Sequence, residues 1–293
     1  MKDMLHSSNI KLCYHIDNIR NIKTSPQPID LVIAVTSRCN LCCKFCYVKN
    51  KPINDLDIEK VKHFIDVVNP KSIEITGGEP TIYKNFEELV CYISGKGIDI
   101  GMTTNGTMLH TIPTSVLAKF TWIRISINEY IDNGRKKDFI LVVKSLPNVY
   151  WGYNYIFTSY LPHKVMTMMY DNVKYCRVTL DINADDATRD RFSKIDLPAR
   201  YFKVEIPKPT DAPKECLLHY VKPLLESDGY VYRCFRDVED FKKDDTKAYT
   251  DIDHPEKLLT YVDEGVNCKK CYNAERINFI NNILNGVTHK NFI

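Results

Sequence analysis

Residues 36–48 read TSRCNLCCKFCYV and place Cys39, Cys43 and Cys46 at the spacing C-x3-C-x2-C. They follow an apolar run, LVIAVT (31–36), which is typical of a buried strand. Three thiolates can bind three irons of a [4Fe–4S] cluster and leave the fourth iron without a protein ligand. Because the open iron can bind a small chelating molecule, this stretch is a candidate catalytic site.

Around this stretch, residues 29–183 alternate short β-branched runs with amphipathic helical patterns, as repeated βα units of a parallel sheet do. We expect six parallel strands, at 31–36, 72–76, 98–104, 122–128, 149–158 and 176–183. Helices are expected between them, at 55–68, 86–93, 113–118, 136–146 and 165–173. Gly95 and Gly97 are expected to end the second helix.

The expected strands are polar on one face and apolar on the other. The fourth strand alternates Ile123, Ile125 and Ile127 with Arg124, Ser126 and Asn128. If helices cover the apolar face, the polar side chains point into an interior that holds a polar ligand. An antiparallel sheet that is solvated on one face gives the same alternation, but the helical stripes fit crossovers better. The inward pattern indicates a substrate pocket that contains Asn154, Thr158, Arg177, Asp181 and Asn183.

The composition limits the class of protein. A chain of 293 residues can form one large α/β domain and a smaller extension. Its net charge of +3 does not require an acidic polymer or an anionic membrane as a partner, and no basic tract indicates nucleic acid. No run of about 18 apolar residues and no secretory signal is visible, which predicts a cytoplasmic protein. Eleven cysteines in such a protein indicate metal or redox use.

The cysteine stretch resembles the cluster-binding loop of radical S-adenosylmethionine (radical SAM) enzymes, with Phe45 at the aromatic position before the last cysteine. Gly77-Gly78-Glu79-Pro80, at the end of the second strand, resembles the GGEP motif of that family. Ser126 and Asn128 lie where the fourth-strand ligand residues of the family lie. The resemblance covers about residues 29–183 and implies a partial (β/α)6 TIM-like barrel, with the cluster at the carboxyl ends of the strands.

The resemblance also implies the cofactors. Cys39, Cys43 and Cys46 would hold a [4Fe–4S] cluster, whose open iron is chelated by the amino and carboxylate groups of S-adenosylmethionine. One-electron reduction would cleave the sulfonium into methionine and a 5′-deoxyadenosyl radical, which takes a hydrogen atom from the substrate. A small electron donor protein, such as a flavodoxin or ferredoxin, would supply the electron.

The same resemblance implies roles for individual residues. Paired glycines, Gly77 and Gly78, would let backbone approach the methionyl part of the cofactor. Glu79 or neighbouring carbonyls would accept from its ammonium group, and Pro80 would hold the turn. Ser126, Asn128 and Asn105 are expected to contact the ribose or carboxylate of the cofactor. The alternatives are a simple βα turn at GGEP and solvated strand residues elsewhere.

A second group of cysteines, Cys216, Cys234, Cys268 and Cys271, follows residue 200. Its spacing resembles the twitch extension, a shorter relative of the SPASM domain, and implies a second, auxiliary [4Fe–4S] cluster. No cysteine follows Cys271, which departs from the full SPASM pattern. A structural zinc site made of the four thiolates is the alternative. The remaining cysteines are expected to be packed or incidental thiols, namely Cys13, Cys42, Cys91 and Cys176.

The sequence thus predicts an N-terminal extension (1–28), a radical SAM partial barrel (29–200) and a small Cys-rich, twitch-like domain (201–293). The predicted function is that of a radical SAM enzyme, either an oxidoreductase or a peptide-modifying enzyme. Peptide modification comes first as its reaction, followed by oxidation of a small molecule. Dehydrogenation of a nucleotide or an aminocyclitol alcohol is an alternative substrate class. The rival from another class is a non-catalytic iron–sulfur or zinc scaffold.

Overall fold

The computed structural model describes residues 8–46, 52–168, 173–198, 201–204, 210–211, 213, 215–234, 248–263, 270–271 and 273–285. Contacts within the chain divide it into two compact units. We call the unit made of Ile33–Ile58 and Ser72–Ile206 the sheet unit. The terminal unit comprises Met1–Val32, Glu59–Lys71 and Pro207–Ile293. The domain boundaries after residues 28 and 200 stay predictions.

The strands of the sheet unit follow one another in chain order. They are β1 (Asp30–Ala34), β2 (Ser72–Thr76), β3 (Asp99–Thr104), β4 (Trp122–Ser126), β5 (Tyr150–Phe157), β6 (Val173–Leu180) and β7 (Tyr201–Val204). From β2 to β7, every neighbouring pair is parallel. The six predicted strands are confirmed with shifted ends. Strand β7 was not predicted, because its four residues are too few to show a periodic pattern.

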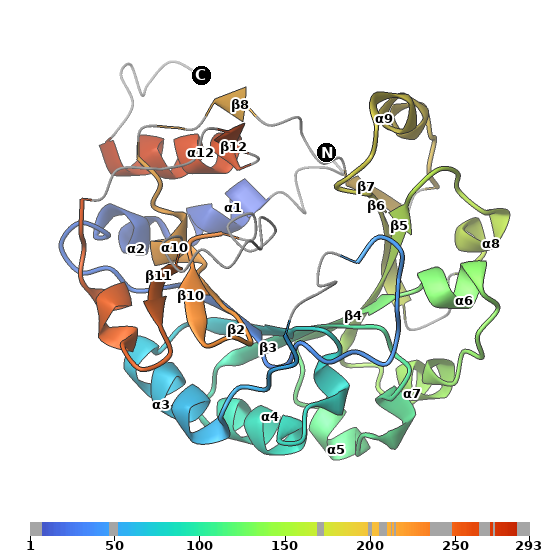
Figure 1. Cartoon of the computed structure of the whole chain (residues 1–293), viewed down its shortest axis with the longest axis horizontal. Coiled ribbons are helices and arrows are strands. Elements are labelled where there is room, and N and C mark those ends of the chain that lie inside the picture. The colour runs from blue at the N-terminus through green and yellow to red at the C-terminus, as the bar shows by residue number, and fades with distance from the viewer. Residues whose placement is uncertain are drawn as a thin grey trace. The chain divides into compact units, whose positions relative to one another are not determined.

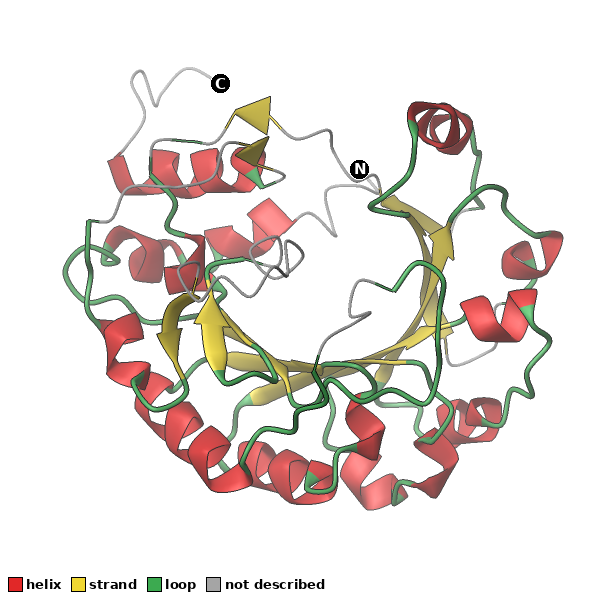
Figure 2. Cartoon of the chain, in the orientation of Figure 1, coloured by secondary structure: helices red, strands yellow, loops and turns green. Residues whose placement is uncertain are grey.

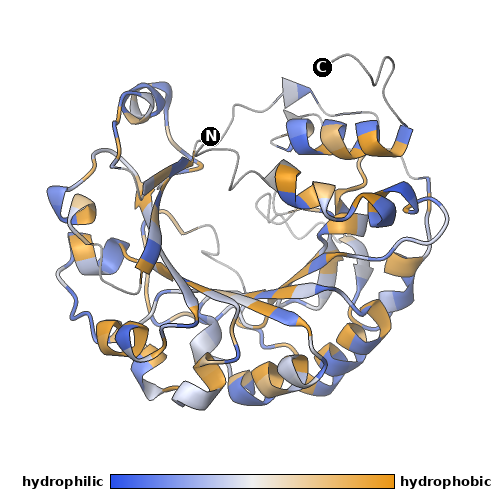
Figure 3. Cartoon of the chain, turned by 180° about the vertical axis from the view of Figure 1, so that it is seen from behind, coloured by the Kyte–Doolittle hydropathy of each residue, from blue (hydrophilic) through white to orange (hydrophobic). Residues whose placement is uncertain are grey.

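Helices α4 (Phe86–Gly95), α5 (Thr114–Leu117) and α7 (Phe139–Ser145) cover one face of this sheet (Figures 1 and 2). Figure 3 shows that these helices carry both hydrophobic and hydrophilic residues, as expected for helices with one buried side. The remaining short elements of the unit are α6 (Asn128–Asp132), α8 (His163–Met166), α9 (Asp186–Ser193), η2 (Pro80–Ile82) and η3 (Leu109–Thr111). Parallel strands joined by such crossovers confirm the predicted α/β fold, a partial TIM-like barrel.

Burial confirms that the strands have two different faces. In β4, Ile123 and Ile125 are fully buried, whereas Arg124 and Ser126 are partly exposed. The same holds for β5, where Asn154 is partly exposed. Its helix-covered face is an aromatic row that is completely buried, made of Trp151, Tyr153, Tyr155 and Phe157. The face opposite the helices is therefore the polar face, as the alternation predicted.

Two sequence predictions near β6 were wrong in detail. The helix expected at 165–173 is only α8, and Val173 already belongs to β6. Val173 and Tyr175 are buried in pairing with β5, so tertiary contacts extend this strand toward its start. At its other end, Asp181 and Asn183 lie in the turn that follows the strand.

The terminal unit combines both ends of the chain. Its helices are α1 (Ser8–Cys13), α2 (Ile16–Arg20), α3 (Ile58–Val68), α10 (Leu218–Val221), η5 (Pro255–Leu259) and α12 (Ala274–Asn285). Strands β9 (Leu224–Leu225), β10 (Tyr230–Tyr232) and β11 (Ala248–Asp251) are antiparallel, as are β8 (Thr210–Asp211) and β12 (Lys270–Cys271). Leu12 and Ile19 share one core with Leu218 and Ile280. Among the described residues, no helix is long and apolar enough to span a membrane.

Candidate functional site

The segment that carries the first three cysteines is closed at its base. Thr36 pairs with Asp55 through an isolated backbone bridge, and its Oγ1 donates to Asp55 Oδ1 at 2.6 Å. Arg38 donates through Nε to the same oxygen at 3.0 Å and forms an ion pair with the carboxylate. Asn54 donates its backbone N–H to Ser37 Oγ at 2.8 Å. Residues 39–46 therefore start from a fixed base, and residues 47–51 lie outside the described part.

The glycine pair after β2, Gly77 and Gly78, lies in a turn that contacts the same base of the cysteine segment. Gly78 donates its N–H to the carbonyl of Thr36 at 2.7 Å, and Glu79 donates to that of Arg38 at 2.8 Å. A Cβ on Gly77 or Gly78 would lie closer than 3.0 Å to the backbone of Thr36 or Arg38, and Gly77 has a φ of +138°. Glycine is thus required because the cysteine segment packs directly on this turn. From the sequence, we expect these two glycines to let the backbone approach the cofactor.

Glu79 is held in place by hydrogen bonds from the chain itself. Its side chain is fully buried and accepts from the N–H and hydroxyl of Thr81, the hydroxyl of Thr104 and the N–H of Asn105. Burial raises the pKa of this carboxyl group, while these donors act in the opposite direction. Four donors from the chain already contact the carboxylate, so Glu79 anchors the turn, and its contact with the ammonium group of the cofactor stays a prediction. Pro80 starts η2 directly after it, as expected for a turn.

We expect Glu79→Gln to lower the free energy of unfolding by about 2 kcal/mol or more, because the new amide N–H2 would face groups that are themselves donors. Glu87→Gln is the matched control, since Glu87 is exposed on α4 and should change stability by less than about 0.5 kcal/mol. Urea unfolding of both variants measures the difference. Equal stability of the two variants would show that the buried network contributes little.

The three cysteine thiols are accessible and close to one another. Cys39 is exposed, whereas Cys43 and Cys46 are partly exposed. Burial, followed by the charges of Glu129, Cys46 and Cys39, raises the pKa of Cys43 to about 11. The Sγ of Cys43 lies 4.0 Å from Glu129 Oε1. Burial also raises the pKa of Cys39, so binding of a metal group to these two thiols would release protons.

The donor set fits an iron–sulfur cluster. Among the residues that the structure describes, no three His, Cys, Asp or Glu side chains are grouped as ligands of one metal ion. A [4Fe–4S] cluster takes one thiolate for each iron, so its ligands surround a cube and do not converge on one point. Three accessible thiols on one short segment agree with this requirement. Phe45, between the last two of them, is partly exposed.

Asn105 connects the end of β3 to the first cysteine. Its Nδ2 donates to Asn40 Oδ1 at 2.8 Å and lies 3.8 Å from the Sγ of Cys39. Its Oδ1 accepts from the N–H of Thr107, and Tyr130 OH donates to its carbonyl at 2.8 Å. Asn105 thus positions the cysteine segment, a role in addition to the cofactor contact expected from the sequence. The hints were only the Asn-Gly dipeptide and the hydroxyl of Thr107.

The two fourth-strand residues have different environments. Ser126 ends β4 and is partly exposed beside Asn154 of β5. Asn128 belongs to α6 and is buried, which corrects its expected position on the polar face of the strand. Its amide donates to the carbonyl of Ile156 at 2.9 Å and accepts from the N–H of Ile156 at 2.8 Å. The Asn128 side chain therefore forms hydrogen bonds with both backbone groups of Ile156 in β5. Of the two fourth-strand residues, Ser126 is the one whose side chain is accessible.

The structure separates the expected substrate residues into two sets. Asn154 and Arg177 pair across β5 and β6 on the polar face, and Thr179 Oγ1 donates to Asn154 Oδ1 at 2.7 Å. The other three lie in turns at the carboxyl ends of these strands, namely Thr158, Asp181 and Asn183. Asp181 Oδ1 accepts from the N–H of Asn183 at 3.0 Å, which shapes its turn.

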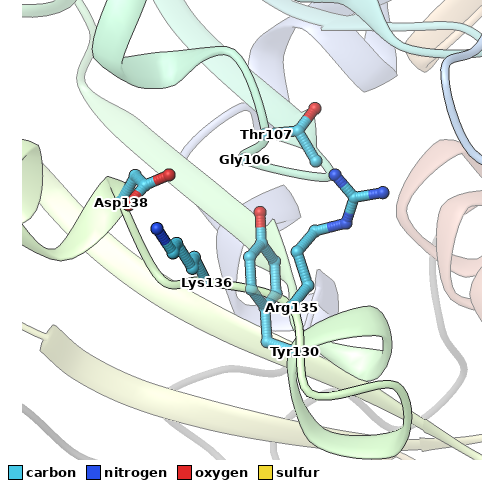
Figure 4. Close-up of a pocket in the computed structure, with 6 residues that line it drawn as sticks. All are labelled: Gly106, Thr107, Tyr130, Arg135, Lys136 and Asp138. Atoms are coloured by element: carbon cyan, nitrogen blue, oxygen red, sulfur yellow. The ribbon is translucent and has the colours of Figure 1, made fainter.

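A polar pocket of about 300 Å³ lies beside the hydrogen-bonded side chains of Asn40, Asn105 and Thr107 (Figure 4). It is lined by Gly106, Thr107, Tyr130, Arg135, Lys136 and Asp138. Asn40 donates to Thr107 Oγ1 at 2.8 Å, so one wall of the pocket belongs to the network that contacts the cysteine segment. Lys136, which lines the pocket, is exposed.

The second cysteine group lies in the terminal unit. Cys216, Cys234 and Cys271 are partly buried and pack against the same apolar cluster, which contains Leu217, Tyr220 and Ile277. Cys268 lies outside the described residues. The structure therefore brings residues 216, 234 and 271 to one core although they are far apart in sequence. Of the other cysteines, Cys13, Cys42 and Cys91 are exposed, and Cys176 is buried.

A parallel α/β sheet with three accessible thiols directly after its first strand is the arrangement that the sequence predicted for a radical SAM enzyme. Residues 33–170 match the family described as the Radical SAM superfamily, so this part of the chain is a radical SAM domain. The [4Fe–4S] cluster and S-adenosylmethionine are the cofactors of this superfamily, as the sequence predicted.

Similar curated proteins differ in function. The chain is 31% identical to an S-adenosylmethionine-dependent nucleotide dehydratase of Selenomonas ruminantium, over 32% of this chain and 37% of that protein. It is 28% identical to the subtilosin biosynthesis protein AlbA of Bacillus subtilis, over 41% and 30% of the two chains. A GTP 3′,8-cyclase of Pelotomaculum thermopropionicum is 43% identical over 27% of each chain. These alignments span about a third of the curated relatives or less.

Among solved structures, SuiB of Streptococcus suis bound to its precursor peptide SuiA superposes with a TM-score of 0.62. The two chains are 15% identical, and the match covers 87% of this chain and 69% of SuiB. SuiB bound to S-adenosylmethionine gives a TM-score of 0.55 at 17% identity, over 78% and 67% of the two chains. At these identities the comparison shows a shared fold.

Proposed function

We propose that this protein reductively cleaves S-adenosylmethionine at a [4Fe–4S] cluster held by Cys39, Cys43 and Cys46 and abstracts a hydrogen atom from a substrate. The observation that carries the proposal is the fixed base of the cysteine segment, which is tied both to Asp55 and to the glycine turn after β2. When bound, the cluster and S-adenosylmethionine supply one-electron cleavage of a carbon–sulfur bond. The test is formation of 5′-deoxyadenosine by the anaerobically reconstituted and reduced protein.

The residues of the chain perform the other tasks in this proposal. Asp55 and the glycine turn hold the base of the segment, and Asn105 holds Asn40, next to Cys39. Ser126, at the carboxyl end of β4, offers a hydroxyl group for the ribose or carboxylate of the cofactor. A small electron donor such as a flavodoxin or ferredoxin supplies the electron.

Peptide modification is the first reaction that we propose. It is supported by the similarity to AlbA, a subtilosin biosynthesis protein, and by the fold shared with SuiB, whose structure contains a precursor peptide. Incubation with peptides encoded beside the gene, followed by mass spectrometry, tests it. A peptide that changes mass only with reduced enzyme and S-adenosylmethionine supports the proposal, whereas unchanged peptides contradict it.

A nucleotide or another small molecule is the second candidate substrate. The nucleotide dehydratase and the GTP 3′,8-cyclases among the relatives favour it. Because these alignments cover about a third of this chain or less, they support the shared chemistry more strongly than the substrate. Consumption of nucleoside triphosphates by the reduced enzyme, measured by chromatography, distinguishes a nucleotide substrate from a peptide substrate.

The rival proposal is a non-catalytic iron–sulfur or zinc scaffold. It differs in one measurable respect, because a scaffold does not cleave S-adenosylmethionine. Reduced radical SAM enzyme is expected to form some 5′-deoxyadenosine even without substrate. Complete absence of this product from a protein that contains the cluster favours the scaffold.

We further propose that Cys216, Cys234, Cys268 and Cys271 hold an auxiliary [4Fe–4S] cluster. The gathering of the three described thiols at one apolar core supports this. Four thiolates leave no open iron, which favours electron transfer over direct binding of the substrate. Zinc remains the alternative occupant, because a site of four thiolates also suits that ion.

Metal analysis is expected to find about eight irons and eight sulfides in each reconstituted chain, and about four of each in Cys216→Ala, Cys234→Ala or Cys271→Ala. Cys91→Ala is the control, because Cys91 is exposed on α4, which belongs to the sheet unit. Four irons in the unmodified chain, or one zinc in place of the second cluster, would contradict the auxiliary cluster.

A further inference from the structure

Two arginines lie close together on the polar face of the sheet. Arg124 is in β4 and Arg177 is in β6, and the strand between them contributes Gly152 opposite Arg124 and Asn154 opposite Arg177. Both arginines are partly buried. Burial and the charge of Arg124 lower the pKa of Arg177 to about 10, so the Arg177 side chain still carries a positive charge at neutral pH. The fold thus holds two like charges together.

The described residues do not neutralise this pair. The Nε of Arg177 is buried and has no hydrogen-bond partner among them. Arg124 donates only to the neutral hydroxyl of Tyr175, at 3.3 Å. Among the described residues, Glu74 is an acidic group whose charge acts on Arg177, and it also accepts from Thr103 at 3.3 Å. A buried donor without an acceptor and an excess positive charge are both unfavourable, and an anionic ligand would relieve both.

Aromatic rings form a rigid base for the pair. The guanidinium of Arg124 lies 4.7 Å from the ring of Trp122, and Tyr175 contacts Tyr150 at a centroid distance of 5.6 Å. A Cβ on Gly152 would collide with the ring of Tyr175, so glycine is needed for this packing. Apolar rings beside the charged groups lower the local dielectric constant, which strengthens attraction of an anion. The rings also fix the planar guanidinium of Arg124.

We propose that Arg124 and Arg177 bind an anionic group of the substrate, either a carboxylate or a phosphate. Guanidinium groups present paired N–H donors that match the oxygens of these two anions. Asn154, paired with Arg177 in register, adds a neutral amide beside the charged site. Calling the ligand a substrate rests on the proposed function, whereas the anion site itself rests on these contacts alone.

Titration calorimetry on the reconstituted full-length protein at low ionic strength tests the site, with succinate and inorganic phosphate as probes and neutral succinamide as the control ligand. We expect saturable binding of succinate or phosphate and none of succinamide, and the tighter of the two anions identifies the group. Arg177→Gln and Arg124→Gln should each weaken this binding about tenfold or more, because each removes a charge-assisted contact. Arg177→Lys should retain part of it.

Arg20→Gln removes the same charge from an exposed helix end of the terminal unit and should leave the affinity unchanged. Circular dichroism identifies any variant that does not fold. If one arginine variant does not fold, the anion affinity of the other arginine variant tests the site. Unchanged affinity in a folded variant, or no saturable binding, would overturn the site. Loss of anion binding in saturating S-adenosylmethionine would assign the pair to the carboxylate of the cofactor and overturn the substrate assignment.

The proposed function has a separate readout. Formation of 5′-deoxyadenosine by the unmodified enzyme without anion binding would refute the arginine site alone. Anion binding by a protein that never forms this product would refute the radical mechanism and leave the site intact.

Discussion

Replacing Cys39, Cys43 or Cys46 with alanine is expected to lower 5′-deoxyadenosine formation by about a thousandfold or more, which corresponds to about 4 kcal/mol in activation free energy. Each thiolate binds its own iron, so loss of one ligand leaves the cluster with two open irons and an unstable core. The measurement is chromatography of the products from anaerobic, reduced protein. Iron content should fall by about four per chain in parallel.

Cys42→Ala is the matched control for this experiment. Cys42 lies in the same segment, is exposed, and does not belong to the C-x3-C-x2-C spacing. Its replacement should preserve both the iron content and the product. If Cys42→Ala were as damaging as Cys43→Ala, the cluster would use a different set of ligands, and the assignment of Cys43 would be wrong.

Gly78→Ala should destabilise the sheet unit by about 3 kcal/mol or more and prevent full loading of the first cluster. The added Cβ would meet the carbonyls of Ser37 and Arg38 closer than 3.0 Å, and backbone atoms cannot move aside as a flexible side chain can. The turn after β2 and the base of the cysteine segment would have to separate. Urea unfolding and iron analysis of the purified variant measure both effects.

Gly95→Ala provides the comparison. Gly95 is the last residue of α4, is exposed, and an added Cβ would meet no atom within 4 Å. This variant should be as stable as the original chain or more stable by about 0.5–1 kcal/mol, because alanine favours the helix. A similar loss of stability in both glycine variants would mean that the close approach at Gly78 is not what requires glycine there.

The second cysteine group shows where sequence reasoning stopped. The spacing of Cys216, Cys234 and Cys271 predicted a metal site, but nothing in it indicated that helices from both ends of the chain share its core. Leu12 and Ile19 pack with Ile277 because they bury apolar surface together, and such long-range pairing has no local signature. The terminal unit is therefore a product of tertiary contacts.

Local patterns determined the parallel α/β fold and led to the proposed ligand set of the first cluster. Strand alternation such as that of Ile123 and Ile125 records which face is buried, and thiol spacing records a chemistry, so both can be read from adjacent residues. Tertiary structure alone decided that Glu79 serves the turn, that Asn128 satisfies β5 and that Arg124 joins Arg177. These roles depend on which hydrogen-bond donors, acceptors and charges from distant segments meet, and residue order does not encode that directly.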